Sequence, residues 1–446
     1  MTQTTFSSNS DEGRSYSLAA DVRRQIVRLR SVALLMLGAA LVIGPVMAWF
    51  NSQTLNNSQA GIAQALLREH YMPFYVIALF VGIVGGLWAE RYQQVPRQSN
   101  FFHSLSPRRG QLLAARVLAV LIIQMVLTLV AVAGIVAVGF ASPVISVAGF
   151  IPHLVVWGVV HWVHIMLITL MSMSVTLLAG QLAGNTTAQV IMSSVLFLTP
   201  AYCGLAIETV LGATTATYMN EGIAERIIQF NPIYPWLMGS NSLDLLYESA
   251  NSGILDLSGI AYSAALWSAA AYVSYAVVIA LALTLTVFLY NRRAAEKAGE
   301  TLIYRSVGTL IKAEFVILGG LFVGMIFYQM SNRMFWAFAL GAVFGAAAVQ
   351  MVAEMIYAQD PQGWKNHMVS TLAGLVITCV LFGVNSFGLI DYDRHVPSAS
   401  AVRAVNVEVD GAGTYSRRSA TSLEKQDAAY VEKALTAMQG LADNQT

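Results

Sequence analysis

The chain carries little charge for its length. Only 11% of its 446 residues are Asp, Glu, Lys or Arg, whereas soluble domains carry about 25%. With 56% hydrophobic residues and a mean hydropathy of +0.61, this composition excludes a soluble enzyme and a disordered protein. A nucleic-acid binder needs a surplus of basic residues, and the net charge here is only +1. We therefore expect a membrane protein with no nucleic-acid partner.

Cysteine is scarce and the common catalytic motifs are missing. The two cysteines, Cys203 and Cys379, lie in apolar runs and form neither a disulfide framework nor a metal-ligand spacing. The sequence contains no GxxxxGK[ST] phosphate loop, no HExxH zinc motif and no GxSxG nucleophile elbow. We therefore expect no catalytic residue, no metal and no cofactor on this chain, which by itself is not an enzyme.

Apolar runs long enough to cross a membrane dominate the sequence. A spanning helix needs about 20 mostly apolar residues. The expected fold is an all-α polytopic membrane protein with about nine transmembrane helices. The predicted segments are 32–50, 73–90, 113–140, 149–179, 185–206, 261–290, 313–330, 335–357 and 367–389.

The distribution of Lys and Arg predicts the orientation. If the N-terminus is cytoplasmic, sixteen of the 25 Lys and Arg residues lie in or beside cytoplasmic loops and three in external loops. Cytoplasmic loops of membrane proteins carry this excess of positive charge. We therefore expect a multi-pass protein of the plasma membrane, in contact with lipid, with its C-terminal tail outside the cell.

The chain divides by composition into five parts. Residues 1–31 are a cytoplasmic tail followed by a basic amphipathic helix at residues 16–31, one face of which is apolar. That helix is expected either to lie in the membrane interface or to act only through the orienting effect of its arginines. The C-terminal tail is expected to be small, extracellular and α+β, or to be a shortened ectodomain. The other expected parts are a six-helix domain at 32–290 with an extracellular helical loop at 207–260, a cytoplasmic loop at 291–312, three additional helices at 313–389 and the tail at 390–446.

Three histidines fall on one predicted membrane helix. His161 and His164 share a helix face, and His153 is roughly aligned with them. Ionisable residues inside a membrane are functional candidates. Hydrogen bonding inside the bundle is the favoured interpretation, and a polar lining of a substrate path is the alternative. A metal site would need further ligands, and none is readable.

The loop after the second predicted helix combines apolar and basic residues. Exposed apolar side chains rimmed by charge indicate a docking site for another protein, although an ordinary amphipathic loop helix on lipid has the same pattern. Ser106 and Pro107 suit the start of a helix. The residues concerned are Asn100, Phe101, Phe102, His103, Ser104, Leu105, Ser106, Pro107, Arg108 and Arg109.

Residues 101–113, which include most of this segment, resemble the "HSLPxxRxxLF" motif of ABC-2-type permeases of ATP-binding cassette (ABC) transporters. Ser106 stands where that family usually has proline. The remainder is similar to a narrower bacterial subgroup, the Ytr-like permeases. Residues 292–300 resemble its "RRKSExAG" loop, residues 354–357 its "EMIF", and residues 391–397 the "GFENxVP" that opens an extracellular domain. The tail here is shorter than that domain.

The resemblance implies a permease subunit that moves a small molecule, drug or peptide. Residues 100–109 would be the coupling helix that docks on separate ATPase subunits, which hold the ATP and magnesium. A second permease subunit, identical or related, would complete the complex. Two other functions stay open: a secondary transporter driven by an ion gradient, and a membrane subunit that senses envelope stress.

Overall fold

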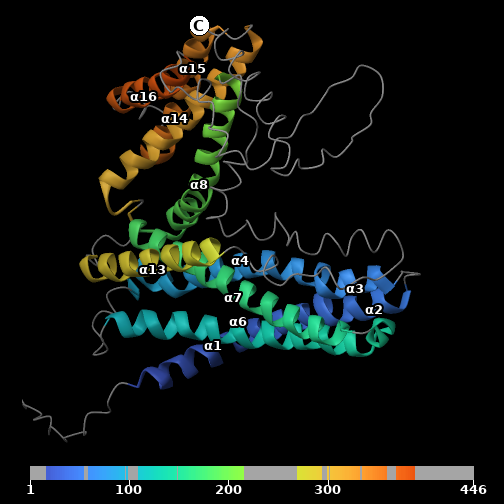
Figure 1. Cartoon of the computed structure of the whole chain (residues 1–446). Helices are drawn as coiled ribbons and strands as arrows, with labels where there is room; N and C mark the ends of the chain where they lie inside the picture. The colour runs from blue at the N-terminus through green and yellow to red at the C-terminus, as the bar shows by residue number, and fades with distance from the viewer. Residues whose placement is uncertain are drawn as a thin grey trace, which may run out of the picture. The chain divides into compact units, whose positions relative to one another are not determined.

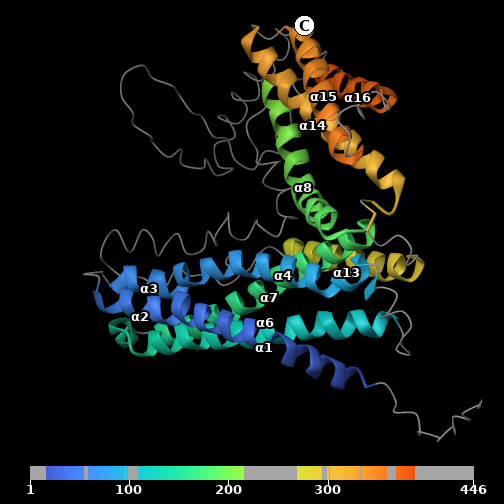
Figure 2. The same cartoon turned by 180° about the vertical axis from the view of Figure 1, so that it is seen from behind.

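The described part of the chain is almost entirely helical, and the chain forms two compact units (Figures 1 and 2). The first unit comprises Met1–Tyr202 and Glu225–Ile311, and the second comprises Cys203–Ala224 and Lys312–Thr446. The described part of the chain contains no β-strand, only an isolated bridge between Ala183 and Leu302. The computed structural model describes residues 17–54, 59–95, 97–98, 109–147, 149–214, 269–293, 299–300, 302–331, 334–358 and 368–386.

In the first unit, α7 packs against α4, α6 and α13, and α1 packs along α6 (Figure 1). The second unit contains α15, α16, the end of α8 and most of α14. The α-helices are α1 (Leu18–Leu41), α2 (Met47–Thr54), α3 (Gln59–Leu67), α4 (Met72–Gln94), α6 (Arg109–Phe140), α7 (Phe150–Leu182), α8 (Thr186–Thr214), α13 (Ala269–Arg292), α14 (Arg305–Met330), α15 (Phe335–Ala358) and α16 (Met368–Ser386). The shorter elements are a π-helix at Val42–Val46 and 3₁₀ turns at Glu69–Tyr71 and Pro143–Ser146.

The prediction of a helical, multi-pass membrane protein is confirmed. Among the described residues, eight helical stretches are long and apolar enough to cross a membrane, and each contains or overlaps one of the first eight predicted segments. The ninth predicted segment corresponds to α16, whose described apolar stretch, Gly374–Val384, is shorter than a membrane span. The predicted external loop is described only as far as Thr214, and the predicted α+β tail lies outside the described residues.

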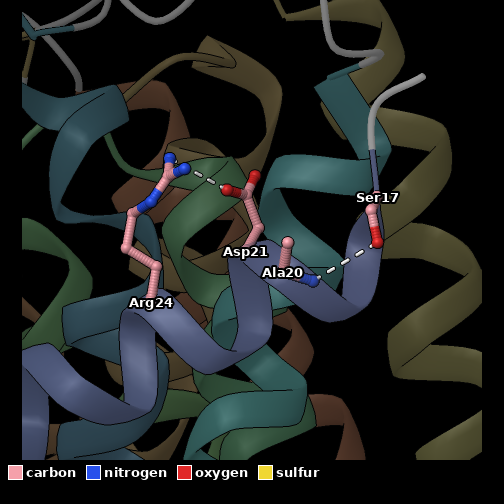
Figure 3. A network of polar contacts seen from close by, with 4 residues as sticks. All are labelled: Ser17, Ala20, Asp21 and Arg24. Carbon is pink, nitrogen blue, oxygen red and sulfur yellow. Dashed lines mark hydrogen bonds and ion pairs between the residues drawn. The ribbon is translucent and has the colours of Figure 1, made fainter. Parts of the chain in front are cut away.

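Helix α1 is longer than its apolar segment. The hydroxyl of Ser17 caps it by accepting a hydrogen bond from the amide of Ala20 at 3.4 Å, and Arg24 pairs with Asp21 at 3.1 Å (Figure 3). The helix continues without a break into the membrane segment, and Val22 packs on α6. The apolar face predicted for residues 16–31 is therefore partly covered by protein. A position in the membrane interface stays a prediction.

Small residues allow α4 and α7 to approach closely. A methyl group at Gly86 would lie 2.8 Å from Cβ of Thr176, and one at Gly82 would collide with Ser172. Both hydroxyls donate back to carbonyls of their own helix, from Ser172 to Ile168 at 2.7 Å and from Thr176 to Ser172 at 2.8 Å. The contact therefore exposes no unsatisfied hydroxyl, as an apolar bundle requires.

Glycines also determine the spacing of α14 and α15 in the second unit. A methyl group at Gly345 of α15 would lie 2.9 Å from the carbonyl carbon of Gly319 and 2.8 Å from Cβ of Val323, both on α14. Two further glycines are equally close to the facing helix. A methyl group at Gly324 would lie 2.7 Å from Cε2 of Phe338 on α15, and one at Gly341 would lie 2.8 Å from Cβ of Phe327 on α14.

Gly345→Ala should destabilise the second unit, because the added methyl group would force the backbones of α14 and α15 apart. We expect a loss of about 1–3 kcal/mol, the usual cost of overpacking. The matched control is Gly38→Ala in α1, where no atom lies within 4 Å of the added methyl group. That change should be neutral or stabilising, since alanine favours helix over glycine. Unfolding temperatures in detergent measure both effects, and equal temperatures for the two variants would contradict the packing.

Candidate functional site

Two of the three predicted histidines, His161 and His164, lie together inside the first unit. The Tyr75 hydroxyl of α4 is 2.5 Å from Nδ1 of His161 and 3.5 Å from Nδ1 of His164. Nε2 of His161 lies 2.8 Å from the carbonyl oxygen of Leu67, and Nε2 of His164 bonds the Tyr272 hydroxyl of α13. Because a carbonyl only accepts, Nε2 of His161 carries a proton, and in a neutral ring Nδ1 then accepts from Tyr75. We call Tyr75, His161, His164 and Tyr272 the His–Tyr cluster.

Aromatic rings enclose this cluster, and His153 stays outside it. The Tyr71 ring stacks on His161 with centroids 4.2 Å apart and planes 11° apart, and the centroid of Trp157 is 5.7 Å away. His153 lies nearer the start of α7 and is only half-buried. No group of three or more His, Cys, Asp or Glu side chains is placed to hold a metal ion in the described ranges. The geometry is that of histidines hydrogen-bonded within a bundle.

Replacement of His161 should destabilise the first unit more than replacement of His153. His161→Leu leaves the Leu67 carbonyl and the Tyr75 hydroxyl without this partner, and each buried unsatisfied group costs about 1–3 kcal/mol. The matched change His153→Leu at a half-buried position should stay within about 0.5 kcal/mol. Unfolding temperatures in detergent measure the difference. An equal loss in the two variants would mean that the hydrogen bonds of His161 contribute nothing to stability.

The predicted coupling segment connects two described helices. Helix α4 ends at Gln94 and α6 begins at Arg109, so this predicted site residue opens a helix. Residues Asn100 to Arg108 of the prediction lie outside the described residues. The helix ends on either side of the segment belong to a buried polar network that the sequence reasoning missed.

The centre of that network is Glu90, whose side chain is 0% exposed. Gln181 at the end of α7 donates to Oε1 of Glu90, and Gln189 near the start of α8 donates to Oε2 at 2.9 Å. Gln189 also donates to the carbonyl of Thr176 at 2.9 Å and accepts from Gln94. Both carboxylate oxygens are thus satisfied by amide donors, as a buried acidic group requires.

Arg293, directly after α13, binds the ends of two other helices. Its Nη1 donates to the carbonyl of Gly180 in α7 at 2.7 Å, and its Nη2 donates to the carbonyl of Gln93 in α4 at 3.3 Å. Carbonyls in the last turn of a helix lack a partner within the helix and carry partial negative charge. Burial lowers the pKa of Arg293, and the nearby Glu90 carboxylate opposes that effect. We call Glu90, Gln181, Gln189 and Arg293 the Glu90 cluster.

A second set of contacts extends this network to α6. The guanidinium of Arg116 lies 4.0 Å from the ring centroid of Tyr92 and donates to the carbonyl of Ala89 at 3.2 Å. The hydroxyls of Tyr92 and of Tyr290 in α13 are 2.5 Å apart. Helices α4, α6 and α13 are therefore joined beside the predicted coupling segment.

The segment after α13 packs on the turn between α7 and α8. The amide of Gly299 donates to the carbonyl of Gly184 at 2.8 Å, and the amide of Ile303 donates to that of Leu182 at 2.9 Å. Gly299 has a φ of 96°, which glycine adopts without a steric penalty. Gly299 and Ile303 thus extend the hydrogen-bonded end of the first unit.

The composition of the helix ends was the only sequence signal for this network. Glu90 is the only acidic residue in α4, and four glutamines lie at the ends of α4 and α7 and the start of α8. The predicted topology places all of these ends on one side of the membrane.

The chain matches no protein-family model, no curated protein and no solved structure.

Proposed function

We propose that this chain is the permease subunit of an ABC transporter. The support is the resemblance of residues 101–113 to the coupling segment of ABC-2-type permeases, together with its position between α4 and α6. The observation that carries the proposal is the Glu90 cluster, which gives the end of α4 before this segment a firm attachment to α7, α8 and α13. A loop that receives force from a partner needs such an attachment.

In the proposed mechanism, ATP binding on two partner ATPases drives movement of Asn100–Arg109. The displacement enters the bundle through the end of α4 and the start of α6. Two permease subunits pair around the substrate path and alternate in access to the two sides of the membrane. The chain contributes positioning and a path, while ATP and magnesium are held by the partner.

A gradient-driven secondary transporter is the second candidate, and the buried carboxylate favours it. Carriers of that class use acidic groups inside the membrane domain to bind the driving ion. Glu90 is such a group, although its oxygens are occupied by Gln181 and Gln189. This candidate predicts transport without an ATPase.

Purification from the native membrane in mild detergent should recover a phosphate-loop ATPase in a one-to-one ratio with this chain. Mass spectrometry of the purified complex identifies the partners, and a second permease in equal amount would indicate a heteromer. Recovery of the folded chain alone, with transport retained in liposomes, would replace the ABC proposal by the gradient-driven one.

Arg108→Glu combined with Arg109→Glu should abolish recovery of the ATPase while membrane insertion is retained, because charge reversal opposes docking at this segment. The matched control reverses two exposed arginines of α1, Arg23→Glu with Arg24→Glu. That control should still recover the ATPase. Full recovery with the loop variant would exclude residues 100–109 as the docking site.

A further inference from the structure

The same three helices are joined at two separate levels. The His–Tyr cluster links Tyr75 of α4, His161 and His164 of α7, and Tyr272 of α13. At the other level, Glu90 of α4, Gln181 of α7 and Arg293 at the end of α13 are linked. The two levels are separated by about four turns of α4, from Tyr75 to Glu90. Two polar attachments at different heights resist both sliding and rotation of one helix against another.

The contacts of the Glu90 cluster are also the ones most sensitive to a change of arrangement. Glu90 is buried at 0% exposure and Arg293 at 6%. A buried polar or charged group that loses its partners is strongly destabilising. The helix ends therefore have one strongly preferred arrangement, in which Arg293 contacts α4 and α7 and the amides contact Glu90.

We propose that Glu90 and Arg293 are positioning residues that form a latch, which makes α4, α7 and α13 move as one body. The latch builds on the function proposed above: a push on the segment after α4 would reach α13 through Arg293. The strap formed by residues 299, 300, 302 and 303, which bonds the turn after α7 through Gly299 and Ile303, strengthens the same attachment. Neither residue contacts a substrate in this role.

A distance measurement on the isolated chain tests the latch without any ATPase. Spin labels are attached to Val95→Cys, just after α4, and Asn291→Cys in α13, both exposed, with Cys203 and Cys379 replaced by serine. The otherwise unchanged chain should give one narrow distance. Glu90→Gln and Arg293→Lys should each broaden it. The first replaces one acceptor oxygen by an NH₂ donor that faces an amide donor, and the second removes the forked contact with two carbonyls.

Two further variants test whether any nearby change of a carboxylate broadens the distance and whether misfolding accounts for the broadening. Glu300→Gln changes an exposed carboxylate on the strap next to the turn after α7, and it should leave the distance narrow. Glu90→Gln combined with Arg293→Gln leaves no unpaired buried charge, so it should fold even if a single variant does not, and it should still broaden the distance. Narrow distances in Glu90→Gln, Arg293→Lys and the double variant would overturn the latch.

The complex with the ATPase tests transmission. Labels at Val32→Cys in α1 and Asn291→Cys in α13 should change their distance when a non-hydrolysable ATP analogue binds, and Glu90→Gln should abolish that change while the ATPase stays bound. A retained change in Glu90→Gln would overturn transmission through the latch. Failure to recover an ATPase would instead overturn the proposed function, and the result on the isolated chain would still stand.

Discussion

The fully buried carboxylate of Glu90 is the constraint on which one end of the first unit depends. Moving an ionised group from water into an apolar interior is costly unless hydrogen bonds and an opposite charge replace the water. In this chain the replacements come from three other elements: Gln181 of α7, Gln189 of α8 and the charge of Arg293 directly after α13. The ends of these elements must therefore stay close together for the bundle to remain folded.

Apolar burial does not provide the same specificity inside a membrane. Lipid chains are as apolar as leucine, so helix association there depends on close packing and on polar contacts. Close packing comes from Gly82 and Gly86 against α7, where the hydroxyls of Ser172 and Thr176 bond their own helix. Glycine contacts fix how near two helices lie, but a smooth contact still permits sliding. Polar clusters fix the register, because their bonds form at one position only.

The helices could be predicted from the sequence because each contains a long apolar run. The helical residues that precede these apolar runs could not be predicted as part of the same spans. The sequence predicts a separate amphipathic helix at residues 16–31. In the structure, however, Val22 and Ile26 pack on Ala115 and Ala119 of α6, and the helix that begins at Leu18 continues unbroken. Tertiary contact overrides the change in composition there. The second predicted segment, 73–90, is likewise extended at its start. Helix α3 precedes α4, and its buried residues include Ala60, Ile62 and Leu66.

The two candidate sites differed in how far the sequence alone could predict them. His161 and His164 are three residues apart on one helix, so helical spacing alone predicts their shared face. Glu90, by contrast, pairs with residues 91 and 99 positions away, and Arg293 contacts α4 across 200 positions. No local pattern marks such partners. In addition, Glu90 beside Arg91 at a helix end resembles an ordinary solvated terminus.

The polar side chains of α7 fall into two kinds, those that bond their own helix and those that bond neighbouring helices. In its middle turns, the hydroxyls of Thr169, Ser172 and Thr176 donate to carbonyls of α7 itself. These hydroxyls therefore need no hydrogen-bond partner on a neighbouring helix. Its strong polar attachments are concentrated at two levels, the His–Tyr cluster and the Glu90 cluster. In the proposed latch, a helix held in this way would transmit displacement along its length, because the α-helix is stiff between the attachments and the neighbours would move with it. Loss of either cluster would leave a hinge at the other, and displacement of one helix end would then turn into rotation about that remaining level.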